Sequence, residues 1–124
     1  MTNFRSACVV LVMVPGLALG CGACIEDKIA ATYDHATVTA AATRGDRIVF
    51  GAIDGAVDPQ RVRERILAMA PRVRGVRKQT VHASIAPPAF SFGLDRRATP
   101  ESAVAELERR MAVPGLRLTV IRVQ

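Results

Sequence analysis

Apolar residues recur every three or four positions in two segments of the second half of the chain, which predicts two amphipathic helices at 59–71 and 100–112. Each segment opens with a capping residue followed by proline, a combination typical of a first helical turn. The residues expected to face the core are Val62, Ile66, Met69, Leu107 and Met111.

Four short runs rich in β-branched or aromatic residues predict strands at 47–54, 76–86, 89–95 and 116–123. The element order from residue 47 is therefore βαββαβ. Two right-handed βαβ units side by side give an α+β fold of the ferredoxin-like type, a four-stranded antiparallel sheet with two helices on one face.

An additional N-terminal helix is predicted over about 25–43, where Ile25, Ile29 and Tyr33 share a spacing of four residues. Arg44 and Gly45 provide a stop signal. We expect this helix to be an appendage that docks through the three apolar residues, because its apolar face would otherwise stay in water. The chain is thus divided into a CxxC segment with a helix (21–45) and a ferredoxin-like domain (46–124).

Residues 1–20 have the pattern of a secretory signal peptide, since Arg5 precedes an uncharged apolar run that is too short to span a bilayer comfortably. This predicts a periplasmic or secreted protein; an uncleaved N-terminal membrane anchor is the alternative. The stretch "LALGC" also resembles a lipoprotein processing site with Cys21 as the lipidated residue. Membrane association of the mature chain is expected only in that case.

The cysteines suggest the clearest chemistry. Cleavage after Gly20 removes Cys8, one of three cysteines in the 124 residues, and leaves Cys21 and Cys24 in a CxxC motif. A disulfide across so small a loop stabilises a fold little. Two thiols at i and i+3 at a helix start are instead suited to form thiolates, which bind soft ions such as Cu(I) and Zn(II). Cys21 and Cys24 are therefore the candidate ligands for copper or zinc.

The βαββαβ order, with "VRGVRKQTV" between the first helix and the second strand, resembles that of the heavy-metal-associated domains. The resemblance implies a ferredoxin-like fold. Members of that family carry paired cysteines in the loop after the first strand. Here that loop, "GAIDGAVDP", contains no cysteine. The family's metal site is therefore not carried over to this chain.

The same order, with "IVFGAI" and "AFSFG", is also similar to RNA-recognition motifs, in which Phe50, Phe90 and Phe92 would stack on bases. The basic residue and glycine that precede the third-strand aromatic in that family are missing. The arginines between 61 and 77 fall mainly on the first helix and its exit, away from such a platform. We expect the phenylalanines to belong to the core, and no nucleic acid to bind.

No recognisable nucleophile turn or phosphate-binding loop is present, so the chain is not expected to be an enzyme. His35 lies about 16 Å from Cys24 along a straight helix and cannot share a metal with it there. Two functions remain. The first is an exported soft-metal-binding or thiol-bearing protein. The second is an exported or lipid-anchored adaptor that binds another protein through its sheet or N-terminal helix, with sheet edges that would also permit self-association.

Overall fold

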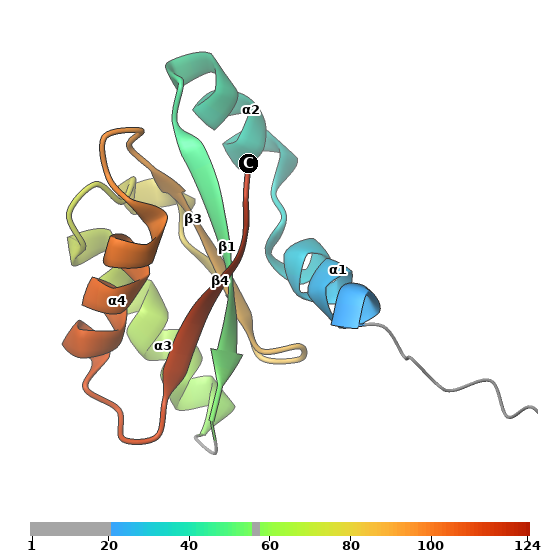
Figure 1. Cartoon of the computed structure of the whole chain (residues 1–124), viewed down its shortest axis with the longest axis vertical. Coiled ribbons are helices and arrows are strands. Elements are labelled where there is room, and N and C mark those ends of the chain that lie inside the picture. The colour runs from blue at the N-terminus through green and yellow to red at the C-terminus, as the bar shows by residue number, and fades with distance from the viewer. Residues whose placement is uncertain (1–20, 56–57) are drawn as a thin grey trace, which may run out of the picture.

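The computed structural model describes residues 21–55 and 58–124, which form a four-stranded sheet between two pairs of helices (Figure 1). The elements in chain order are α1 Cys21–Thr32, α2 His35–Arg44, β1 Arg47–Asp54, α3 Pro59–Met69, the 3-10 turns η1 Ala70–Arg72 and η2 Lys78–Thr80, β2 His82–Ser84, β3 Ala89–Leu94, α4 Pro100–Met111 and β4 Arg117–Val123. The predicted α+β class is confirmed.

The strands are arranged in the order β2-β3-β1-β4, and each neighbouring pair is antiparallel. Val49 of β1 lies opposite Phe92 of β3, and Ile53 lies opposite Leu118 of β4. The predicted four-stranded antiparallel sheet is confirmed, and three of its strands begin and end within one residue of the predicted positions.

Helices α3 and α4 cover one face of the sheet and enclose the larger hydrophobic core. The residues predicted to face the core do so: Val62, Ile66, Leu107 and Met111 are buried, and Met69 is partly buried and packs against them. Both helices begin with the expected proline, and Asp58 caps α3 by accepting a hydrogen bond from the Gln60 N–H.

The second strand departs from its prediction over 76–86, because only His82–Ser84 forms regular strand. Thr80 takes over part of the pairing with β3. Its Oγ1 accepts from the Gly93 N–H at 2.7 Å, and the Arg77 N–H donates to the Gly93 carbonyl at 2.8 Å. A side-chain hydroxyl thus replaces a main-chain partner, and residues 78–80 turn as a 3-10 helix.

The predicted helix at 25–43 is two helices that meet at Tyr33 and Asp34. Asp34 caps α2, since its carboxylate accepts from the Thr37 N–H at 2.9 Å. The carbonyl of Thr32, at the end of α1, accepts from the Ser91 Oγ at 2.8 Å and so fixes α1 to β3. The expected docking is confirmed for Ile29, which is 6 % exposed, and for Ile25, which packs partly buried against the same cluster, but it is wrong for Tyr33, which is 46 % exposed.

Helices α1 and α2 cover the second face of the sheet and form a smaller core of Ile29, Ala41, Ile48 and Phe50. An ion pair between Glu26 of α1 and Arg122 of β4 adds a polar link. The pKa of Glu26 is lowered by its hydrogen bond to Arg122. The N-terminal helices are therefore a structural layer of the fold rather than an appendage.

Gly51 in the middle of β1 allows the closest packing in the larger core. A Cβ atom at this position would fall on the ring of Phe90, which is fully buried and stacks on Phe92 with ring centroids 5.9 Å apart. The missing side chain at Gly51 therefore makes the space that Phe90 fills.

We predict that Gly51→Ala lowers the free energy of unfolding by about 3 kcal/mol, because the added methyl overpacks the core. Phe90→Leu removes the obstructing ring atoms, so the double variant is expected to be more stable than the sum of the single losses implies. Urea denaturation of the parent, both single variants and the double variant measures this coupling. Strictly additive losses would contradict the proposed contact.

Candidate functional site

Cys21 and Cys24, the predicted metal ligands, are the first and fourth residues of α1, one helical turn apart along the backbone. The carboxyl-terminal half of this helix is held on the sheet by Ile29 and Thr32. The predicted signal peptide, residues 1–20, lies outside the described residues. Across 25–55 and 58–124, where side chains are described, no three His, Cys, Asp or Glu side chains are grouped closely enough to hold a metal ion.

The two histidines lie at the starts of α2 and β2, and tertiary folding brings His82 close to the cap of α2. The His82 Nε2 lies 3.4 Å from Thr37 Oγ1, and that hydroxyl donates to Asp34. The hydrogen bonds from Thr37 lower the pKa of Asp34. The Thr37 proton is thus directed to a carboxylate rather than to the imidazole, an arrangement that caps a helix and does not activate a nucleophile.

The three phenylalanines that resemble a base-stacking platform are all in the core, as expected from the sequence. Phe50 packs under α1 and α2, whereas Phe90 and Phe92 pack under α3 and α4. None of the three rings is available to an unpaired base.

A strongly basic region lies where β1 starts and β3 ends. We call it the arginine-rich end and define it by residues 44–47, 72–78 and 95–98. Its basic members are Arg44, Arg47, Arg72, Arg74, Arg77, Lys78, Arg96 and Arg97, and its acidic members are Asp46 and Asp95. The remaining nine basic and nine acidic residues of the chain balance, so these three segments account for the whole formal charge of +6.

The three segments are joined by hydrogen bonds. The Asp95 N–H donates to the Gly75 carbonyl at 2.8 Å, and the Arg47 guanidinium donates to the Ala98 carbonyl at 2.6 Å. Figure 1 shows the end of α2, the start of β1 and the loop between β3 and α4 at one end of the molecule. Residues distant in sequence therefore form one surface.

Asp46 fixes two of the arginines. Its carboxylate, which is 3 % exposed, accepts two hydrogen bonds of 2.9 Å from Arg77 and lies 3.4 Å from Arg44 Nε. Arg77 also reaches Asp95 at 3.2 Å. The hydrogen bond from Arg77 is the main cause of the lowered pKa of Asp46. This network links the end of α2, β1, the segment before η2 and the end of β3.

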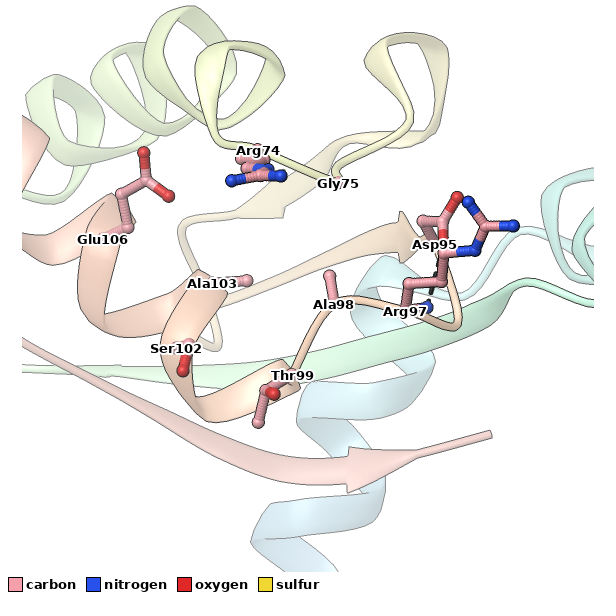
Figure 2. Close-up of a pocket in the computed structure, with 9 residues that line it drawn as sticks. All are labelled: Arg74, Gly75, Asp95, Arg97, Ala98, Thr99, Ser102, Ala103 and Glu106. Atoms are coloured by element: carbon pink, nitrogen blue, oxygen red, sulfur yellow. Dashed lines mark hydrogen bonds between the residues drawn. The ribbon is translucent and has the colours of Figure 1, made fainter.

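A pocket of about 420 Å³ opens beside this network, between the turn at Gly75 and the first turn of α4 (Figure 2). Arg74 and Arg97 line it from two different segments, together with the hydroxyls of Thr99 and Ser102 and the carboxylate of Glu106. In the part of the chain that the structure describes, no ion pair involves Arg74 or Arg97. The sequence placed Arg74 at a helix exit, but it did not bring the 95–98 loop, which carries Arg97, close to it.

Comparisons of the chain with protein-family models, curated proteins and solved structures found no match. Among the described residues, no helix combines the length and the apolar character that a membrane crossing requires. The site is therefore interpreted from its own chemistry.

We predict that Asp46→Asn lowers stability at neutral pH and that the difference from the parent shrinks in acid. The pKa of Asp46 is lower in the folded than in the unfolded chain, so its carboxylate contributes stability above the ordinary aspartate pKa. That contribution is lost as the pH falls through the lowered value. Urea denaturation between neutral pH and about pH 3 measures the effect.

Asp54→Asn, at the exposed opposite end of β1, is the matched control, since no ion pair of Asp54 is recorded among the described residues. If the two variants follow the same pH profile, the Asp46–Arg77 pair does not contribute as proposed.

Proposed function

We propose that this chain is an exported protein that binds a soft metal ion, copper or zinc, or carries reactive thiols, through Cys21 and Cys24. The observation that carries the proposal is their position as the first and fourth residues of α1. In a mature chain that begins at Cys21, the first four N–H groups of α1 lack partners inside the helix, and this end of the helix carries partial positive charge. Both features favour the thiolates that soft ions require.

The anchoring of α1 also supports this proposal. Ile29 is buried against the sheet and Ser91 holds the carbonyl of Thr32, so the first turn extends from a fixed helix. Two thiolates suffice for near-linear Cu(I), whereas a closed zinc site needs two further ligands. Cu(I) is therefore the first ion to test.

We further propose that β1 to β4 with α3 and α4 form a ferredoxin-like split βαβ fold, related to that of heavy-metal-associated domains. The strand order supports this assignment, because β3 separates β1 from β2 and β1 separates β3 from β4. The irregular segment at η2 and the added layer of α1 and α2 are departures from the simple pattern. The fold proposal does not move the metal site into the loop after β1, where cysteine is absent.

A second candidate function is an exported or lipid-anchored adaptor that binds another protein. The concentration of the net charge in the arginine-rich end favours it, since segregated charge steers a partner of opposite sign. Both faces of the inner strand β1 are already covered by helices of the same chain. Binding across an open sheet face, one of the modes expected from the sequence, is therefore not available at β1.

We predict that reduced protein starting at Cys21 binds Cu(I) stoichiometrically and that a Cys21→Ser, Cys24→Ser variant loses this binding. Anaerobic titration against a chromogenic Cu(I) chelator measures both proteins. A His35→Ala, His82→Ala variant is the matched control and is expected to bind like the parent. Equal weak binding by the parent and the serine variant would leave the cysteines without a metal role.

We also predict that the mature protein begins at Cys21, because cleavage follows Gly20. Mass spectrometry of protein from the soluble and membrane fractions of the native cells measures this and reads the state of the thiols. A diacylglycerol adduct on Cys21 would assign that residue to anchoring and favour the adaptor function. An intact Met1 or Thr2 on a cytoplasmic protein would contradict export.

A further inference from the structure

We propose that the arginine-rich end is a docking surface for an acidic segment of a partner protein, in which a carboxylate side chain enters the pocket between Arg74 and Arg97. The inference rests on the second candidate function and supplies its surface. It does not depend on Cys21 or Cys24.

The charge of the chain is concentrated at the arginine-rich end. Eight basic residues and only two acidic ones share the three joined segments, while the remainder of the chain is neutral. Clustered like charges repel one another and therefore oppose folding, so the cluster is not explained by stability alone. An acidic partner would relieve this repulsion and would be guided to this end of the molecule.

The arginines of this end fall into two groups, one paired within the fold and one free of recorded ion pairs among the described residues. Asp46 holds Arg77 through two hydrogen bonds, and the Ala98 carbonyl holds Arg47. These residues build the surface. Arg74 and Arg97 are exposed, and no ion pair is recorded for either within the described ranges. Their planar guanidinium groups suit bidentate binding of carboxylate.

The surface at this end is concave beside Arg74 and Arg97. The pocket of about 420 Å³ is lined by the two arginines, with the hydroxyls of Thr99 and Ser102 as additional donors (Figure 2). The carboxylates of Asp95 and Glu106 also line it, but Asp95 pairs with Arg77 and Glu106 pairs with Arg110. A glutamate side chain carries an apolar stem and a charged end. The pocket offers the methyl groups of Ala98 and Ala103 beside these donors, which matches that combination.

The composition of this end favours a protein over a membrane or a nucleic acid. Among the described residues, the exposed large apolar side chains are Tyr33, Ile85 and Val123, and all three lie outside the defining segments. Binding to a membrane surface usually adds inserted apolar side chains to the charge, and single-stranded nucleic acids stack on aromatic rings. The segments that form the arginine-rich end contain no aromatic residue.

The test is fluorescence anisotropy with a labelled poly-glutamate peptide and the full mature chain. Arg74→Glu, Arg97→Glu is expected to weaken binding at least about tenfold. Arg61→Glu, Arg109→Glu makes the same change in net charge at exposed positions of α3 and α4 outside the end, and it is expected to bind within about twofold of the parent. Binding is also expected to weaken as salt is added, because the Debye length falls to about 8 Å at physiological ionic strength.

The double variant Arg74→Gln, Arg97→Gln controls for a folding defect caused by the reversed charges. We expect it to lose an intermediate amount of peptide affinity and to keep the circular dichroism spectrum of the parent. If the two Glu variants lose the same amount of peptide affinity, net charge alone explains the effect, and the proposed site is wrong. Tighter binding to phosphatidylglycerol vesicles or to single-stranded DNA than to the peptide would overturn the choice of partner. Absence of peptide binding by the parent at low salt would overturn the inference, while adaptor binding through another surface would still be detected by cross-linking in the native envelope.

Discussion

Burial of β1 on both faces is the constraint on which the rest of the structure depends. Val49 and Ile53 face the core under α3 and α4, whereas Ile48 and Phe50 face the core under α1 and α2. Leaving a large apolar side chain in water forgoes about 1.5–3 kcal/mol, so a sheet covered on one side would lose the contribution of Ile48 and Phe50. The second helical layer is therefore required by the strand itself.

The sequence predicted those elements whose signals are local. Periodic apolar residues and cap-then-proline starts located α3 and α4, and the run "RIVFGAID" located β1. The run also contains a signal that was missed, because its apolar character is continuous rather than alternating, which is typical of a strand buried on both faces. The break between α1 and α2 could have been predicted from Asp34, a strong N-cap residue. The shortening of β2 could not, since it depends on the contact between Thr80 and Gly93.

The two candidate sites also differ in whether their signal is local in the sequence. The spacing of Cys21 and Cys24 is a local pattern, and their place in one helical turn follows from it. The arginine-rich end is made by three segments that are far apart in sequence, so composition reported the excess of charge but not its location. Sequence reasoning grouped Arg61 with Arg77 on one helix and its exit. Tertiary structure instead leaves Arg61 on α3 and joins Arg77 to Asp46 and Asp95.

The two acidic residues of that end show which part of the charge serves the fold. The side chain of Asp46 is almost fully buried, and its pairing with Arg77 links the start of β1 to the segment before η2. This pairing accounts for Arg77, and the neighbouring contact accounts for Arg44. Within 21–55 and 58–124, Arg74 and Arg97 form no comparable ion pair, although like charges nearby make their presence unfavourable for stability. Residues that lower stability and make no stabilising contact are characteristic of binding surfaces. Arg74 and Arg97 also line a pocket.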